Sequence, residues 1–376
     1  MKRIQMVDLA GQYAKIQSEI DSVVLDVVRS TKYINGPEVQ SFAKDLQAYL
    51  DVKHVIPCAN GTDALQVAMM ALNLKPGDEV ITTAFTFVAT AEVIALLGLK
   101  PVFVDVNPET FNIDPACISK AITPKTRAVV PVHLFGQCAN MEEISEVARQ
   151  NNLFVIEDNA QAIGADFIYS DGSRAKAGTI GHFGCTSFFP SKNLGCYGDG
   201  GALFTNDDML AEKARSVANH GMTKRYYHDF IGVNSRLDSV QAAILRVKLR
   251  YLDDYTLSRQ EAAMYYDKAF YNNPRLAIPR RASFSTHVFH QYTLVTRDID
   301  RNGLQEHLAS NDIPAMIYYP VPLHMQKAYL EYGNTPVKLP VTEHLCNSVI
   351  SFPMHTELEQ EQIEHITTSV LEFVNN

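Results

Sequence analysis

The sequence has no long hydrophobic run. Its most apolar stretch, residues 84–99, contains or adjoins four threonines and Glu92. It is too short and too polar to span a bilayer. Residues 1–13 carry two basic side chains with no apolar segment behind them, so we expect no secretory signal peptide. These absences predict a protein that is not held in a membrane.

Cysteine and histidine motifs are missing as well. The six cysteines are scattered and form no C-x-x-C pair. In a chain of this length we interpret them as reduced thiols, which predicts a cytoplasmic protein. There is no H-E-x-x-H motif, and His287 and His290 lack obvious companion ligands. We therefore expect no metal site.

Basic residues are fewer than acidic ones. Lys and Arg number 33 against 42 Asp and Glu, which gives a net charge of −9. This balance disfavours non-specific binding to nucleic acid or to an anionic membrane. With 46% hydrophobic and 20% charged residues, the composition is that of an ordinary globular protein. A chain of 376 residues predicts two domains.

Short apolar runs alternate with helical patterns from about residue 52. Strand-like runs lie at 54–57, 79–82, 101–106, 128–132 and 153–156. Apolar strands separated by helices indicate an α/β fold, with a mostly parallel central sheet and helices on both faces. Further on, helical patterns at 302–310 and 359–374 accompany strand-like runs at 291–295 and 314–318. We predict a large domain over residues 1–250 with an N-terminal arm, and a smaller α+β domain over residues 251–376.

The first of three chemical features is the segment 60–65. Open parallel sheets bind ligands at the carboxyl ends of their strands, and this segment follows a predicted strand. Gly61 and Thr62 open a helix there and offer free N–H groups and a hydroxyl, which suits a phosphate. The alternative is an ordinary helix cap provided by Thr62 or Asp63.

The second feature is Asp158, at the end of the strand-like run 153–156. A buried carboxylate needs a partner, and this could be Mg²⁺ or a protonated ring nitrogen. The Walker spacing G-x-x-x-x-G-K is absent, which weakens the metal interpretation. For this motif alone, a helix cap is an equally good interpretation.

The third feature is Lys192, within the segment 187–201. The lysine lies among aromatic residues and glycines. A desolvated lysine has a lowered pKa and becomes a nucleophile or a Schiff-base former. A lysine that only extends its amine to solvent is the alternative. Ser187 could add a hydroxyl for a phosphate.

Together the three features match what a protein contributes to pyridoxal 5′-phosphate (PLP) chemistry. At these residues the chain resembles the DegT/DnrJ-type sugar aminotransferases, which are PLP enzymes of the aspartate-aminotransferase fold (fold type I). The likeness covers nearly the whole chain and includes the segments 33–39, 59–65, 157–164, 187–201, 232–243 and 319–324.

The resemblance implies a role for each site residue. Lys192 would be catalytic, bonding to the cofactor and moving a proton between cofactor and sugar. Phe87 would stack on the ring, although a plain core aromatic is an equal alternative. The implied cofactor-binding residues are Gly61, Thr62, Asp63 (through its N–H), Phe87, Asp158, Gln161, Ser187, Lys192 and Asn234. Among these, Asp158 would pair with the pyridine nitrogen and Gln161 would contact the 3-hydroxyl.

The segment 232–238 resembles a part of the family that enters the neighbouring subunit's site, which implies at least a homodimer. Asn234 would reach the cofactor phosphate there. The alternative is a helix start capped by Asp238. The family often has His-Tyr-Pro where this chain has Tyr318 and Tyr319 before proline, so Tyr318 departs from the pattern. The implied substrate-binding residues are Asn35, Arg236, Tyr318, Tyr319 and His324.

The string 234–238 is most similar to enzymes that aminate C3 of a UDP-linked 3-oxo-N-acetylglucosaminuronate, since Arg236 can clamp a carboxylate bidentately. L-Glutamate would convert PLP to pyridoxamine 5′-phosphate, and the keto sugar nucleotide would then take the amino group. The implied pathway is bacterial surface polysaccharide assembly, such as lipopolysaccharide O-antigen. The alternatives are a dTDP-3-oxo or UDP/GDP-4-oxo sugar, a sugar dehydratase in which histidine replaces the lysine, a non-catalytic regulatory protein, and a generic α/β nucleotide-binding protein.

Overall fold

A seven-stranded sheet forms the centre of the protein. The computed structural model describes residues 2–330 and 337–375. The strand order is β1-β9-β8-β5-β4-β2-β3, and within this sheet only β9 runs antiparallel to its neighbours. The strands are β1 (His54–Cys58), β2 (Glu79–Thr83), β3 (Lys100–Val104), β4 (Thr126–Val130), β5 (Phe154–Asp158), β8 (Phe183–Ser187) and β9 (Gly201–Thr205). The predicted α/β class is confirmed.

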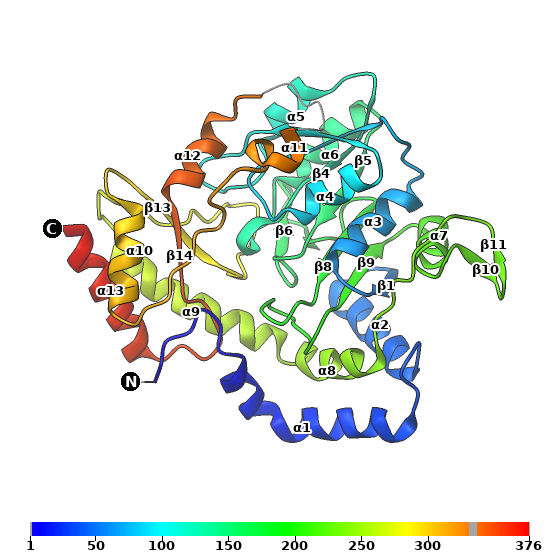
Figure 1. The fold of residues 1–376 in the computed structure, drawn as a ribbon, viewed down its shortest axis with the longest axis horizontal. Coiled ribbons are helices and arrows are strands. Elements are labelled where there is room, and N and C mark those ends of the chain that lie inside the picture. The colour runs from blue at the N-terminus through cyan, green and yellow to red at the C-terminus, as the bar shows by residue number, and fades with distance from the viewer. Residues whose placement is uncertain (1, 331–336, 376) are drawn as a thin grey trace.

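Helices cover both faces of this sheet (Figure 1). One face carries α3 (Gly61–Ala71), α4 (Ala89–Leu96) and α7 (Asp208–Ala218). The other carries α2 (Pro37–Leu50), α5 (Pro115–Ala121), α6 (Met141–Gln150) and α8 (Ser239–Leu249). Neighbouring strand residues pack on opposite faces: Val80 lies in the first core and Ile81 in the second. Because both faces are buried, the strands are apolar along their length.

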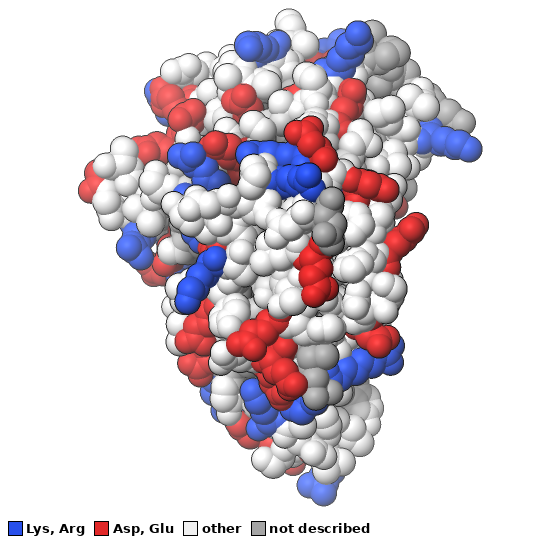
Figure 2. Space-filling view, turned by 90° about the vertical axis from the view of Figure 1, so that its left-hand side faces the viewer, with Lys and Arg blue, Asp and Glu red and all other residues white. Residues whose placement is uncertain are grey.

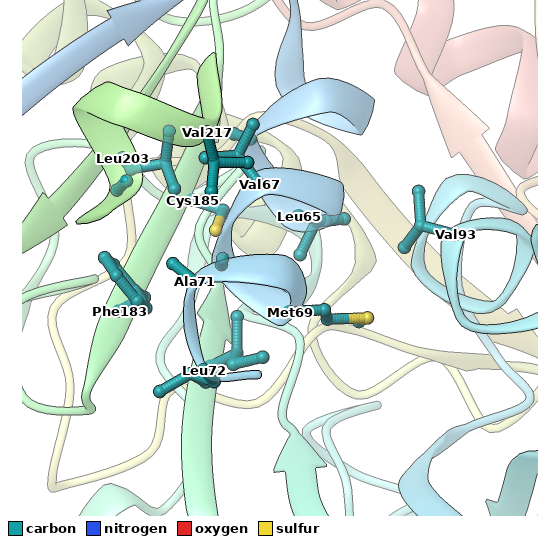
Figure 3. Close-up of a cluster of buried hydrophobic side chains, with 14 of the residues drawn as sticks. Leu65, Val67, Met69, Ala71, Leu72, Val93, Phe183, Cys185, Leu203 and Val217 are labelled. Carbon is teal, nitrogen blue, oxygen red and sulfur yellow. The ribbon is translucent and has the colours of Figure 1, made fainter. Parts of the chain in front are cut away.

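The core beneath α3 is shown in Figure 3. Leu65 and Met69 from this helix, with Leu72 directly after it, pack in one buried cluster with Phe183 and Cys185 from β8. This packing fixes the helix against the sheet. It therefore also fixes the start of α3, which lies at the edge where the strands end.

A second core lies around a three-stranded antiparallel sheet. Its strands are β12 (Leu276–Ala277), β13 (Tyr292–Thr296) and β14 (Val349–Phe352). It is covered by α9 (Leu252–Phe270), α10 (Arg301–Ser310) and α13 (Gln360–Asn375). The α9 helix reaches both cores, because Leu252 packs beneath the large sheet and Tyr266 in the second core. The domain boundary near residue 250 stays a prediction.

The predicted strand at 314–318 is wrong. Met316 forms one isolated bridge with Ser351 of β14, and no ladder follows from it. The run is apolar because it packs against neighbouring segments, with Ile317 beside the buried Phe85 cluster. Apolar burial without a continuous backbone partner gives a strand-like sequence but no strand.

The remaining elements lie around these two cores. They are α1 (Leu9–Ser30), η1 (Leu134–Gly136), β6 (Asp166–Ile168), β7 (Arg174–Lys176), β10 (Met222–Lys224), β11 (Tyr227–His228), η2 (Leu323–Met325), α11 (Lys327–Leu330) and α12 (Pro340–Ser348). α1 packs along α8, and the β10–β11 hairpin projects from the body (Figure 1). No helix in the described residues is long and apolar enough to cross a membrane. Acidic and basic side chains intermix on the face in Figure 2.

Candidate active site

Strands β1, β5 and β8 end at one edge of the large sheet. Cys58 ends β1 and Ser187 ends β8, and both pair with Gly201 of the intervening β9. Asp158 ends β5 and pairs with Cys185 of β8. The three sequence features that follow these strands are therefore brought together.

The turn that opens α3 lies directly against Ser187. A Cβ atom on Gly61 would lie only 2.7 Å from the Ser187 Cβ, so this approach requires glycine. Within the described part of the chain, the N–H groups of Gly61 and Thr62 have no acceptor. Two free N–H groups at a helix start, facing a serine hydroxyl, form a cradle that fits a phosphate.

The cap of α3 is Asn60, which corrects the alternative of Thr62 or Asp63. Asn60 Oδ1 accepts the Asp63 N–H at 2.8 Å. An asparagine immediately before the first helical residue has the reach to bond the third N–H. The Asp63 N–H is therefore already engaged, although the resemblance implied that it would hold the phosphate.

Asp158 is a buried carboxylate with no ion-pair partner among the described residues. Its Oδ1 accepts the Ala160 N–H at 3.2 Å, and its Oδ2 accepts the Thr90 hydroxyl at 2.7 Å. Among the described residues, no basic side chain forms an ion pair with it. No helix follows β5, so the helix-cap interpretation is wrong. A buried carboxylate without an ion-pair partner fits a positively charged ring nitrogen.

The neighbouring Glu157 has a structural role. Its carboxylate accepts His133 Nε2 at 2.8 Å, and both side chains are fully buried. His133 Nδ1 accepts the Ala139 N–H, so the proton lies on Nε2. Three further N–H groups donate to Glu157, those of Gly178, Ile180 and Gly181. Every lone pair of Glu157 is used to fix the end of β5, which positions Asp158.

Lys192 lies in the loop between β8 and β9. Its N–H donates to Phe189 O at 2.8 Å, and the next residue, Asn193, donates to Val288 O at 2.8 Å. Burial of the amine lowers the pKa of Lys192 to about 8, and the Asp158 carboxylate opposes part of this shift. Compared with an exposed lysine, a larger fraction of the amine is neutral near pH 7, which makes it a nucleophile.

The aromatic and amide candidates also reach this edge of the sheet. Phe87 is 55% exposed, so it is not a plain core aromatic, and its ring centroid lies 6.5 Å from that of Tyr319. Gln161 Oε1 accepts the Phe135 N–H at 2.7 Å, and Nε2 donates to Tyr319 Oη at 3.1 Å. Burial raises the pKa of Tyr319, so this phenol stays neutral.

Two further substrate candidates lie on the segment around Tyr319. Tyr318 is half-buried, with its ring centroid 5.9 Å from that of Tyr319. His324 is enclosed, and its Nε2 lies 3.3 Å from Glu343 Oε1. The Leu323 N–H donates to the carbonyl of Ala84, so this segment lies beside the end of β2.

The segment 234–236 lies against the phosphate cradle of its own chain. Ser235 Oγ accepts the Ala59 N–H at 3.1 Å and donates to Asp63 Oδ2 at 2.6 Å. Asn234 is exposed and Arg236 is half-buried. In the described part of the chain, Arg236 forms no ion pair. This cation is therefore available to an anionic ligand.

Asn35 lies on the turn before α2, with a φ of 51°. The turn is fixed to the start of α8, because the Ser239 N–H donates to Tyr33 O at 2.9 Å and the Gly36 N–H to Ser239 Oγ at 3.1 Å. Asn35 therefore lies beside the segment that carries Arg236.

Sequence reasoning missed the contribution of Thr90 entirely, and it assigned no role at the site to Ser235 or His290. Ser235 lies in the string 234–238, but its contacts with the start of α3 appear only in the tertiary structure. His290 is buried, and burial together with the charges of Lys192 and Arg259 lowers its pKa. Its imidazole is therefore neutral beside Lys192.

Residues 14–371 match the model of the DegT/DnrJ/EryC1/StrS aminotransferase family. The chain belongs to this family. The aminotransferase is 45% identical to a "pleiotropic regulatory protein" of Geobacillus stearothermophilus over 98% of both chains. It is 44% identical to the UDP-2-acetamido-2-deoxy-3-oxo-D-glucuronate aminotransferase of Pseudomonas aeruginosa, over 98% of this chain and 99% of that one.

Solved structures share the fold over the full length. S. venezuelae DesV in complex with a ketimine intermediate is 36% identical to the aminotransferase, with a TM-score of 0.95 and complete coverage of both chains. The protein is therefore a PLP-dependent aminotransferase. The cradle, the buried Asp158 without an ion-pair partner and the half-buried Lys192 with its lowered pKa fit this cofactor.

Proposed function

We propose that this aminotransferase moves the amino group of L-glutamate to a keto sugar nucleotide. The specific acceptor that we propose is C3 of a UDP-linked 3-oxo-N-acetylhexosaminuronate, in bacterial surface polysaccharide biosynthesis. The name of the P. aeruginosa relative supports this substrate. In this chain the observation that carries it is Arg236, a guanidinium with no ion-pair partner in the described residues, which follows Ser235, whose hydroxyl bonds Asp63 at the start of α3. A guanidinium binds a uronate carboxylate in bidentate geometry.

When bound, PLP supplies an electron sink for the carbon that bears the amino group. Gly61, Thr62 and Ser187 would hold its phosphate through N–H and hydroxyl donors at the start of α3. Asp158 would hold the positive charge of the ring nitrogen. Each of these groups is fixed before the cofactor arrives, because α3 and β5 are anchored by buried side chains.

Lys192 would transfer the proton at the reacting carbon. A general acid–base group works best when its pKa lies near the working pH, and burial lowers the pKa of Lys192 to about 8. Phe87 would lie on the ring face, and Gln161 would hold the ring hydroxyl while it is oriented by Phe135 and Tyr319.

We further propose a cytoplasmic homodimer with shared sites. Asn234 is exposed on a segment that follows the β10–β11 hairpin, and the hairpin presents Tyr226 and Tyr227 to solvent, as the stretch between them presents Ile231. Ile231 is 88% exposed. Clustered exposed apolar side chains are typical of protein interfaces, so this region is the part of the surface that would contact the second subunit.

Absorption spectra of the purified protein test the proposal. Excess L-glutamate should convert the visible band of the lysine-bound cofactor to that of pyridoxamine 5′-phosphate. Adding the UDP-linked 3-oxo-hexuronate should restore the first band. The matching sugar nucleotide that lacks the carboxylate should restore this band less well. If both compounds restore the band equally, the uronate assignment is contradicted. If the visible band does not change when L-glutamate is added, the result would favour the non-catalytic regulatory alternative.

A further inference from the structure

Thr90 connects two parts of the site that are far apart in the sequence. It is the second residue of α4 and its side chain is fully buried. Its Oγ1 lies 2.7 Å from Asp158 Oδ2 and 3.4 Å from Phe87 O. We infer that Thr90 is a positioning residue for the cofactor ring, because its hydroxyl holds the Asp158 carboxylate in place. This inference rests on the proposed role of Asp158.

The geometry shows which acceptor receives the hydroxyl proton. A threonine has a single hydroxyl proton, so it cannot donate fully to Asp158 and Phe87 together. The bond to the carboxylate is the shorter and is charge-assisted, so it takes the proton. Phe87 lies three residues earlier in the chain, just before Val88, the N-cap of α4. The same helix start therefore carries the hydroxyl that holds Asp158 and the ring that would cover the cofactor.

Thr90 provides the strongest hydrogen bond to Asp158 in the described residues. The other donor to its carboxylate is the Ala160 N–H, at 3.2 Å from Oδ1. A hydrogen bond donated to a buried carboxylate stabilises its charged form relative to the protonated acid. Only the charged form can compensate a protonated ring nitrogen. Removing the hydroxyl should therefore weaken both cofactor binding and the electron-accepting power of the ring.

Thr82 offers a matched control on the neighbouring strand β2. Its hydroxyl is also fully buried, but it donates to the backbone carbonyl of Val130 at 2.8 Å. Replacing either threonine with valine removes one buried hydroxyl at constant shape. Only Thr90→Val alters a group that faces the cofactor.

The experiment compares wild type, Thr90→Val, Thr90→Ser and Thr82→Val as full chains. The measurements are the PLP dissociation constant, the nitrogen-15 chemical shift of labelled bound PLP, the single-turnover rate with L-glutamate, and the melting temperature without cofactor. We expect Thr90→Val to weaken PLP binding and slow the turnover by about tenfold each, since it loses a hydrogen bond to a charged group. Its ring-nitrogen signal should shift towards the unprotonated position. Thr90→Ser should remain near wild type.

Thr82→Val should lower only the melting temperature. A Thr90→Val protein with the wild-type nitrogen-15 shift, affinity and rate would overturn the inference alone. A wild type that binds no PLP would overturn the proposed function together with the inference. Thr90→Ala supports the same comparison if the valine variant does not fold.

Discussion

The side-chain amide of Gln161 donates to Tyr319 Oη at 3.1 Å, across 158 positions of sequence. Gln161 follows β5 of the large sheet, whereas Tyr319 precedes η2 and packs with Phe85 in a separate buried cluster. The other end of the amide accepts the Phe135 N–H, so its orientation is fixed. One hydrogen bond thus couples the segment carrying the substrate candidates to the proposed cofactor site.

Tyr319→Phe should loosen this coupling. The variant removes the phenolic oxygen and leaves the Gln161 Nε2 without its partner, at a cost of about 1 kcal/mol. We expect PLP binding to weaken by about fivefold, measured by absorbance titration. Tyr265→Phe is the control, because Tyr265 donates to Glu364 on the protein surface. Equal PLP affinity in the two variants would contradict a role for the Gln161–Tyr319 bond.

Lys192→Arg should abolish transamination. A guanidinium does not lose its proton in proteins, so it can neither bond to the cofactor aldehyde nor act as a general base. We expect the rate with L-glutamate to fall by about 10³-fold, as for the loss of a positioned acid–base group. Lys120→Arg, at an exposed position on α5, should leave the rate unchanged. Activity retained in Lys192→Arg would show that another group moves the proton.

The capture of PLP by the cofactor-free protein should depend on pH through Lys192. Only the neutral amine attacks the aldehyde, and burial lowers the pKa of Lys192 from 10.5 to about 8. The capture rate should therefore rise with pH up to about 8 and level off above it. Stopped-flow absorbance at a series of pH values measures this profile. A rate that continues to climb towards pH 10 would indicate an ordinary, solvated lysine.

Lys248→Met should stabilise the cofactor-free protein. Lys248 is 1% exposed, forms no ion pair in the described residues, and lies with its amine 5.3 Å from the Tyr197 ring centroid. Burial lowers the pKa of Lys248 to about 8. The unfolded chain holds this proton more tightly, so wild-type stability should rise as pH increases from about 8 to 10.5.

Methionine keeps the length of the side chain and removes the buried charge. We expect the free energy of unfolding near pH 7 to rise by about 1–3 kcal/mol, because the desolvation cost disappears while the cation–π contact is lost. Urea unfolding at pH 7 and pH 10 measures the gain, which should shrink at the higher pH. The exposed Lys120→Met should change stability by less than about 0.5 kcal/mol. If Lys248→Met were less stable than wild type, the ammonium would have a hydrogen-bond acceptor whose stabilisation exceeds the desolvation cost of the charge.

Arg236→Ala should affect a carboxylated substrate selectively. Losing a bidentate guanidinium–carboxylate pair should raise KM for the UDP-3-oxo-hexuronate by about 10- to 100-fold. The KM for the matching sugar nucleotide without a carboxylate should not change. Arg149→Ala, which removes a surface pair with Glu146, should change neither KM. Equal losses for both substrates would place Arg236 on the nucleotide rather than on the sugar.

The sequence by itself determined the α/β class and the principal chemical groups. Buried parallel strands leave continuous apolar runs, and turn residues at their ends mark the ligand edge. Lys192 and Asp158 stand in such local patterns, so neighbouring residues were enough to find them. Gly61 was found in the same way, because it follows the predicted strand at 54–57, whereas its contact with Ser187 appears only in the structure.

Only the tertiary structure decided how these groups are held. Thr90 lies 68 positions from Asp158, and no periodicity or turn pattern relates them. Whether Asn60 accepts the Asp63 N–H was decided by backbone geometry at the start of α3. Residues 314–318 do not form a strand, because only Met316 makes a bridge, to Ser351. Local sequence encodes burial and turns, whereas the partner of a hydroxyl, an N–H or a strand is chosen by the packing of distant segments.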